Sequence, residues 1–145
     1  MKYRRMKDDI YIRLDKGDSI VSSILNVCHK EIIQGGYIQG IGACDKAVLS
    51  TYISEKNTFV DHTYTGMIEM VSLMGNISID DAEVPILHSH AVFSYLSDNG
   101  KCEVVAGHLK DAHISYTGEI VLRTDGEKIE RMFDEKAGIE VWKLK

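Results

Sequence analysis

The sequence has little of what would divide it into separate parts. It contains one proline, Pro85, in 145 residues, and no Ser/Gly-rich or low-complexity stretch that would act as a linker. No segment repeats another, which argues against a repeat architecture. Hydrophobic residues make up 44% and charged residues 27% of the chain, a balance typical of one globular domain with a packed core. We therefore expect residues 1–145 to form a single domain.

Cysteines and long apolar runs are also scarce. The three cysteines, Cys28, Cys44 and Cys102, are an odd number, lie far apart and form no Cys-x-x-Cys pair. This pattern excludes a disulfide framework and a zinc ribbon. The start of the chain, "MKYRRMKDD", lacks the hydrophobic stretch that follows the basic residues of a signal peptide. We predict a cytoplasmic protein with no membrane partner.

Positive charge is in deficit, because the formal net charge is −5. Broad electrostatic contact with nucleic acid needs clustered lysine and arginine, so this balance disfavours it. The local exception is "KYRRMK" at the N-terminus, which contains Lys2, Arg4, Arg5 and Lys7. The sequence favours a solvated tail that frays. The alternative is an arm that contacts DNA phosphates.

The period of the hydrophobic pattern changes once near the N-terminus. Residues 9–15, "DIYIRLD", alternate as a strand does. A helix is predicted next, because apolar residues recur at helical spacing at Ile20, Ile24, Val27, Cys28 and Ile32. Asp18 or Ser19 is the expected N-cap, and Gly35 or Gly36 the expected C-terminal stop. This helix places Cys28 in the core.

The rest of the chain is predicted to be mainly strands with short polar connections. Strands are expected over residues 37–53, 58–66, 67–79, 86–96, 102–110, 113–124 and 139–145. Residues 125–138 are expected to form a turn with a short helical piece. This order predicts an α+β fold, in which one main α-helix covers a curved, mainly antiparallel β-sheet.

Three of the six histidines lie in one predicted hairpin, "PILHSHAVFSYLSDNGKCEVVAGHLK". In a strand, residues i and i+2 point to the same face, so His88 and His90 share a face. A three-residue loop over residues 98–100, with a left-handed Gly100, is a favoured hairpin turn. It would place His90 opposite His108, with His88 as their diagonal neighbour. A loop one residue longer or shorter would turn His108 to the other face.

In that register, three imidazoles converge and could bind one divalent transition metal per chain. Zinc is the first choice, with iron or nickel as alternatives, because imidazole suits all three. Three protein ligands would leave an open position. The competing interpretation is that the histidines are ordinary polar residues of a half-exposed strand. Glu69 and Glu103 are the nearest candidates, chosen by elimination, either to hydrogen-bond a metal-binding histidine or to act as a general base.

Other known site motifs are missing. The segment "GGYIQGIGA" follows the predicted helix and leads into a strand, the reverse of the order that a dinucleotide-binding fingerprint needs. The chain contains no phosphate-binding G-x-x-x-x-G-K-[ST] motif and no G-x-S-x-G motif of a nucleophilic serine. His29, His62 and His113 do not join the hairpin pattern.

Five segments in order resemble the plants and prokaryotes conserved (PPC) domain: "IRLDKGDSIVSSI", "GGYIQGIGACDKAVLSTY", "GMIEMVSLMGNIS", "LHSHAVF" and "VAGHL". The resemblance runs from about residue 11 to residue 144. It implies an α+β domain with a strongly bent antiparallel sheet, assembled as a homotrimer. Prokaryotic members often carry a DNA-binding label. Several members carry a metal on the H-x-H and GH motifs, which correspond here to His88, His90 and His108.

The sequence lacks the R-G-R-P hook that grips the minor groove of DNA in plant members of that family. The leading hypothesis is therefore a homotrimeric metal-binding protein with a regulatory or assembly role, whose histidine site either holds a small-molecule ligand or supports the fold. The alternative is a metal-dependent enzyme of hydrolase or lyase type that acts on an unknown small molecule. A third hypothesis is DNA binding through the N-terminal basic residues.

Overall fold

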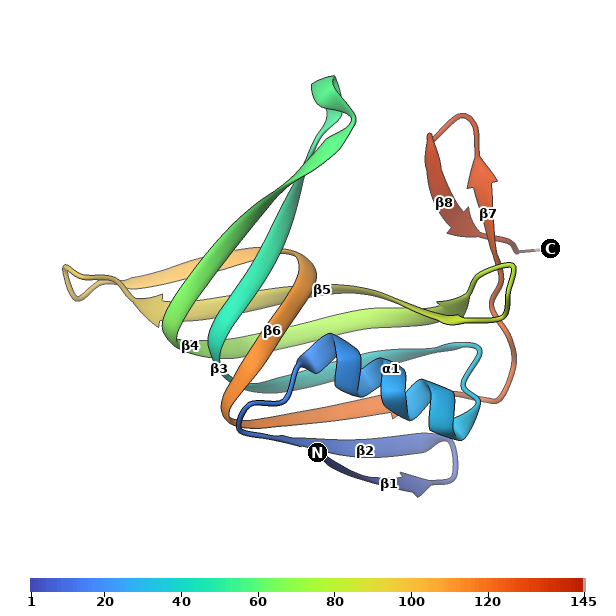
Figure 1. Ribbon diagram of the computed structural model, residues 1–145, viewed down its shortest axis with the longest axis horizontal. Coiled ribbons are helices and arrows are strands. Elements are labelled where there is room, and N and C mark those ends of the chain that lie inside the picture. The colour runs from blue at the N-terminus through green and yellow to red at the C-terminus, as the bar shows by residue number, and fades with distance from the viewer. Residues whose placement is uncertain (145) are drawn as a thin grey trace.

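The computed structural model describes residues 1–144, and in that range it contains one α-helix and eight β-strands (Figure 1). The helix is α1 (Ile20–Glu31), and a short 3-10 helix, η1, covers Ser54–Lys56. The strands are β1 (Lys2–Met6), β2 (Asp9–Asp15), β3 (Gly36–Ile53), β4 (Thr58–Ile79), β5 (Pro85–Leu96), β6 (Cys102–Arg123), β7 (Arg131–Asp134) and β8 (Ile139–Trp142). Residue 145, the last of the predicted strand over 139–145, lies outside the described residues.

The main sheet is antiparallel and strongly bent, which confirms the predicted α+β class. Its strand order is β1-β2-β6-β3-β4-β5, and β5 also pairs with β6. The pairings β3–β4, β4–β5, β5–β6 and β6–β3 therefore form a closed circuit. Figure 1 shows the long strands β3 and β4 curving out of the helix-covered part into a projecting arm that ends at η1. The β7–β8 hairpin projects separately.

The structure corrects the predicted secondary structure in three places. The strands expected over 58–66 and 67–79 are one strand, β4, and those over 102–110 and 113–124 are one strand, β6. Gly66 does not end β4: it has a φ of 109° at a shift of register with β3, and pairing resumes beyond it. Residues 125–138 contain strand β7 and no helix. A turn follows Asp134, whose carboxylate accepts hydrogen bonds from the amides of Lys136 and Ala137.

The prediction of a frayed N-terminus is wrong. Residues 2–6 form β1, which pairs along its whole length with β2. The terminal ammonium group of Met1 lies 2.7 Å from an oxygen of Asp18 and 3.1 Å from one of Asp15. These carboxylates raise the pKa of the ammonium, and they are supplied by the last residue of β2 and by the turn that follows it. Sequence composition alone does not reveal this anchor.

Helix α1 begins as predicted and ends earlier than predicted. Ser19 is the N-cap, and its hydroxyl also donates to the carboxylate of Asp111 on β6, which ties the helix to the sheet. The helix ends at Glu31, and its C-cap, Ile32, has a left-handed φ of 54° and an exposed side chain. The sequence pattern placed Ile32 in the core, but the neighbouring Ile33 is the buried residue. No helix in residues 1–144 has the length and apolarity to cross a membrane.

The hydrophobic core lies between α1 and the sheet face that it covers. Phe93 of β5 is among the largest fully buried side chains, and residues from every strand of the main sheet except β1 join it in one cluster. On β5 the buried residues Ser89, Ala91 and Phe93 alternate with side chains on the opposite face. His88 and His90 are therefore directed away from the core.

The cysteines differ in accessibility, and this predicts their reactivity. Cys28 and Cys44 are buried, and burial raises the pKa of both thiols to about 12, whereas Cys102 is exposed. Because the thiolate is the reactive form, we expect one thiol per native chain to react with a disulfide reagent, and three after denaturation. Cys102→Ser should abolish the native reaction. Two or more reactive thiols in native wild-type protein would contradict the packing of Cys28 and Cys44.

Candidate metal centre

The hairpin that carries the histidines has the predicted register. His90 of β5 is the direct cross-strand partner of His108 on β6, and Leu96 pairs with Cys102 at the closed end. The loop is closed by a 2.9 Å hydrogen bond from the amide of Ser97 to the carbonyl of Lys101. Gly100 has a φ of 75°, the left-handed conformation that this turn requires. Local turn chemistry thus determines the face to which His108 points.

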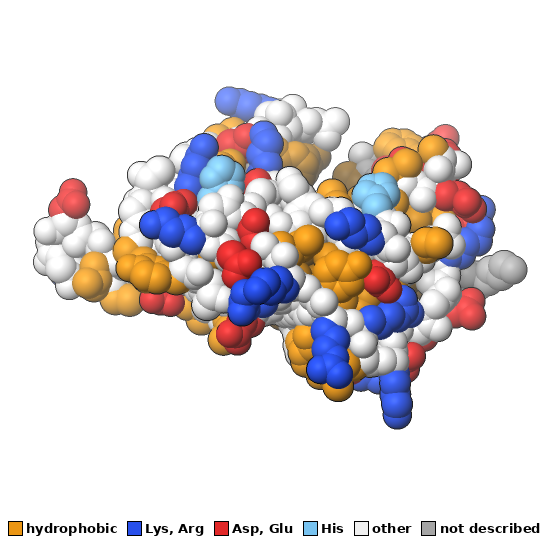
Figure 2. All heavy atoms as spheres, turned by 60° about the horizontal axis from the view of Figure 1, so that its bottom comes forward, with side chains coloured by type: hydrophobic (Ala, Val, Ile, Leu, Met, Phe, Trp, Pro, Cys, Tyr) orange, Lys and Arg blue, Asp and Glu red, His pale blue; other side chains and the backbone are white. Residues whose placement is uncertain are grey.

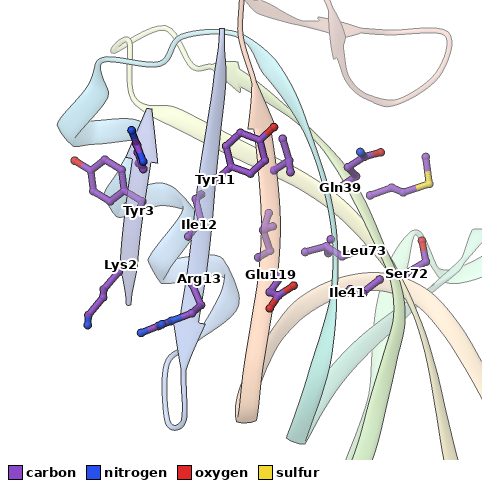
Figure 3. A pocket seen from close by; sticks show the side chains of 15 residues that line it. Lys2, Tyr3, Tyr11, Ile12, Arg13, Gln39, Ile41, Ser72, Leu73 and Glu119 are labelled. Atoms are coloured by element: carbon purple, nitrogen blue, oxygen red, sulfur yellow. The ribbon is translucent and has the colours of Figure 1, made fainter. Parts of the chain in front are cut away.

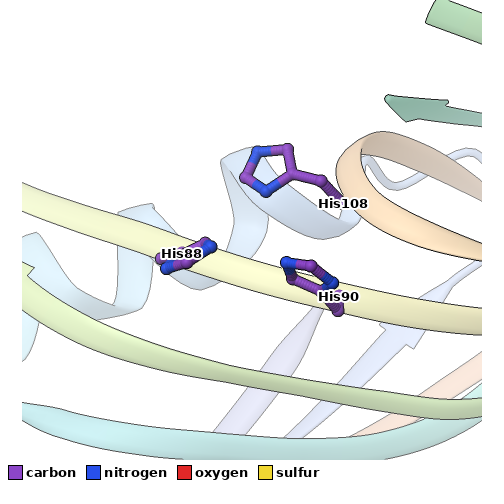
Figure 4. A group of neighbouring side chains, drawn as sticks. All are labelled: His88, His90 and His108. Atoms are coloured by element: carbon purple, nitrogen blue, oxygen red, sulfur yellow. The ribbon is translucent and has the colours of Figure 1, made fainter. Parts of the chain in front are cut away.

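The three imidazoles converge on the sheet face opposite α1 (Figure 4). Their ring centroids are separated by 5.4 Å (His88–His90), 5.3 Å (His88–His108) and 5.4 Å (His90–His108). One ring nitrogen of each lies within 4.8 Å of those of the other two. Metal–nitrogen bonds are about 2.0–2.1 Å for zinc. Small rotations of the rings bring three nitrogens to that distance from one ion, so the residues fit a metal.

The surroundings favour the neutral, metal-binding form of the imidazoles. Partial burial lowers the pKa of His88, and the nearby His90 and Arg131 lower it further. Burial also lowers the pKa of His108, followed by the effects of His88 and His90. Within residues 1–144 the cluster includes no carboxylate or thiol, so a bound metal would keep an open coordination position.

These lowered pKa values predict how the stability of the metal-free protein depends on pH. The unfolded chain, in which a histidine titrates near 6.5, takes up protons before the folded chain does. The contribution of the neutral imidazoles to the free energy of unfolding is therefore complete only about one pH unit above 6.5, and it is lost as the pH falls through 6.5 toward the lower, folded pKa values. We expect the urea midpoint to decrease between about pH 7.5 and about pH 5.5. The variant His88→Ala/His108→Ala should show a smaller decrease, and an equal one would contradict this assignment.

The other predicted site residues lie elsewhere. Glu69 of β4 pairs with Ser94, four residues along β5 from His90, and Glu103 pairs with Tyr95, five residues away. At about 3.3 Å per residue these positions are roughly 13 and 16 Å along the strand from His90. The structure therefore does not bring either carboxylate to the histidines. His29, His62 and His113 also lie outside the cluster.

A different carboxylate, which the sequence did not single out, is closer in the sheet. Ser50 of β3 is the cross-strand partner of His108, and its hydroxyl donates to Asp61 of β4 at 2.7 Å. Asp61 also forms an ion pair with Lys110, which, with the Ser50 hydroxyl, lowers the pKa of this carboxyl. Asp61 and Ser50 are far from His108 in sequence, so only strand pairing reveals this neighbourhood.

The N-terminal basic residues are divided between the two faces of β1. Lys2 and Arg4 line an open groove on the outer face of the sheet, together with Arg13 of β2 (Figure 3). Arg5 points to the other side and forms an ion pair with Glu31 of α1 at 3.3 Å. On the face shown in Figure 2, lysine and arginine side chains are interspersed with acidic ones. The basic residues therefore do not form one arm.

The fold and the histidines together define a bent, antiparallel α+β domain with a three-histidine cluster that can hold a metal. A sequence model of the Plants and Prokaryotes Conserved (PCC) domain matches residues 1–125, and the chain belongs to this family. This confirms the resemblance that the sequence motifs indicated. No curated protein matches the chain.

Several solved structures share the fold. A putative DNA-binding protein from Bacteroides thetaiotaomicron has a TM-score of 0.88 and 26% identity, covering 97% of this chain and 95% of that one. A metal-containing protein from Archaeoglobus fulgidus has a TM-score of 0.80 and 33% identity, covering 97% and 96%. A plant- and prokaryote-conserved (PPC) protein from Pyrococcus horikoshii has a TM-score of 0.79 and 29% identity, covering 99% and 94%.

Proposed function

We propose that this protein binds one divalent transition metal per chain through His88, His90 and His108, with zinc as the first choice. The observation that carries the proposal is the convergence of three imidazole nitrogens within 4.8 Å of one another. The lowered pKa values of His88 and His108 support it, because neutral imidazole is the ligand form. The similarity to a metal-containing protein from Archaeoglobus fulgidus is further support.

We also propose that the protein acts as a homotrimer with a regulatory or assembly role. The outer face of the sheet carries large apolar side chains that are about half exposed or more, at Tyr11, Tyr37, Ile41 and Met74. Exposed apolar patches on soluble domains commonly mark self-association. Native mass spectrometry of the full chain tests the assembly, and a monomer at micromolar concentration would contradict it.

The decisive test of the metal site is metal content. The wild-type chain, purified without an affinity tag or added metal, is analysed by elemental mass spectrometry beside the triple variant His88→Ala, His90→Ala, His108→Ala. We expect about one equivalent of a transition metal in the wild type and almost none in the variant. The matched control, His29→Ala, His62→Ala, His113→Ala, removes the same number of histidines outside the cluster and should retain the metal.

The outcomes separate the roles of the site. Metal removal by a chelator with no change in fold or assembly would assign a ligand-binding role, whereas unfolding or dissociation would assign a structural one. Absence of metal from the wild type, together with no uptake of added zinc, would show that the histidines are ordinary polar residues. The hydrolase or lyase alternative needs a general base, and the cluster includes no carboxylate within residues 1–144.

A second candidate function is DNA binding, which the description of the Bacteroides relative favours. In this chain it would use Lys2, Arg4 and Arg13, which line one groove with Tyr11, Ile41 and Met74, so DNA would compete with self-association for this surface. Binding to duplex DNA should then weaken steeply with salt and be reduced in the variant Lys2→Ala/Arg4→Ala. Arg5→Ala, on the same strand but paired with Glu31, is the control. Equal binding by both variants would exclude this interface.

A further inference from the structure

Aromatic side chains from the projecting arm lie beside the histidine cluster. The ring of Phe59 on β4 is 5.7 Å from that of His108, and the ring of Tyr52 on β3 is 5.2 Å from Phe59. Both rings are about half exposed, at 54% and 45%. The hydroxyl of Tyr52 donates to Asn57 at 2.6 Å, which holds that ring near the tip of the arm. Phe59 and Tyr52 therefore line one side of the cluster.

Strand pairing places Phe59 and Tyr52 on the same sheet face as the proposed metal ligands. His108 pairs with Ser50, and Tyr52, two residues along β3, pairs with Phe59. Residues two apart in a strand, and residues directly opposite, share a face. The side chains of Tyr52 and Phe59 are therefore on the His108 side of the arm, in agreement with the ring distances.

A polar, cationic side lies at the other end of the cluster. Asn76 of β4 is the cross-strand partner of His88, and Ser78, two residues further, is on the same face. The guanidinium of Arg131 donates to the Ser78 hydroxyl at 3.4 Å and to the carbonyl of Glu140 at 2.7 Å. A guanidinium has five N–H donors, so donors remain for a ligand.

We propose that the site binds a small aromatic carboxylate, with its carboxylate at the open position of the metal and toward Arg131, and its ring against Phe59 and Tyr52. The inference rests on the proposed metal site. A carboxylate is the ligand class that a metal ion and a guanidinium both attract. Against Phe59 an aromatic ring gains apolar burial, which a polar body of the same charge lacks, and an edge-to-face contact, which an aliphatic body does not make.

The test uses the full chain loaded with cobalt(II), whose visible absorption reports ligands that enter the metal's coordination sphere. Benzoate and acetate are titrated separately into the wild type. We expect both to change the spectrum, and benzoate to bind about tenfold more tightly than acetate. In Phe59→Ala, benzoate affinity should decrease to about that of acetate while acetate affinity stays unchanged. Arg131→Gln should weaken both anions.

The control is Tyr116→Ala, which removes an exposed ring from β6 outside the arm and should leave both affinities unchanged. If cobalt gives no bound spectrum and elemental analysis finds no metal, the proposed metal site fails, and this inference fails with it. If cobalt binds but benzoate and acetate have equal affinity, or Phe59→Ala leaves the preference intact, only the aromatic-carboxylate inference is overturned.

Discussion

Replacing His90 with alanine is expected to lower the affinity for zinc by more than about 100-fold, since even removal of an indirect partner of a metal ligand costs 10–100-fold. The centroid of the His90 ring lies 5.4 Å from those of both His88, on the same strand, and His108, on the neighbouring strand. Its loss leaves two imidazoles, too few for a tight site. The fold should persist, because the His90 side chain is exposed.

The measurement is a competition titration of metal-free protein against a chromophoric chelator. The similar ring separations in the cluster predict comparable losses for His88→Ala and His108→Ala. His62→Ala, which removes an exposed histidine of the arm, serves as the matched control and should bind zinc as the wild type does. A His90→Ala protein with unchanged affinity would show that the metal is bound elsewhere.

Replacing Phe93 with alanine is expected to lower the free energy of unfolding by about 3–5 kcal/mol, the usual cost of removing a buried aromatic side chain. Phe93 has no exposed surface and pairs across the sheet with Met70 and Val105. The cavity would open beneath the strand that carries His88 and His90, so the same variant should also loosen the metal site.

Urea unfolding measures this effect, and the protein concentration is held fixed because the stability of the proposed trimer would depend on it. Phe133→Ala removes the same side chain from the exposed surface of β7, where the ring is 56% accessible. A surface change of this kind usually alters the free energy of unfolding by less than about 0.5 kcal/mol. Equal destabilisation by the two variants would contradict the position of Phe93 in the core.

The features that local interactions determine were predictable. Turn residues at 98–100 set the hairpin register, and that register placed His90 opposite His108 as expected. The helix start at Ser19 follows from the capping preference of a serine hydroxyl. In each case the partners are close in sequence, so their geometry follows from a few backbone angles.

The predictions that were wrong concern residues whose partners are distant in sequence. The sequence predicts a frayed tail at the N-terminus, but pairing with β2 and an ion pair between the Met1 ammonium and Asp18 order this segment. The sequence predicts a strand end at Gly66, but β4 continues through this residue, because β3 pairs with β4 both before and after it. A glycine ends a strand or bends it according to what lies alongside, and composition does not encode that.

The fold class and the convergence of the three histidines were predictable from the sequence, since alternation, helical spacing and a short turn are local properties of the chain. The family was predictable from the resemblance of five motifs. The surroundings of the histidines became apparent in the folded chain alone: Phe59 and Tyr52 on the arm, Asp61 beyond Ser50, and Arg131 from the C-terminal hairpin. These residues meet because the long strands bend and the sheet pairs with itself. Such closure depends on contacts between segments far apart in the chain, which no local pattern specifies.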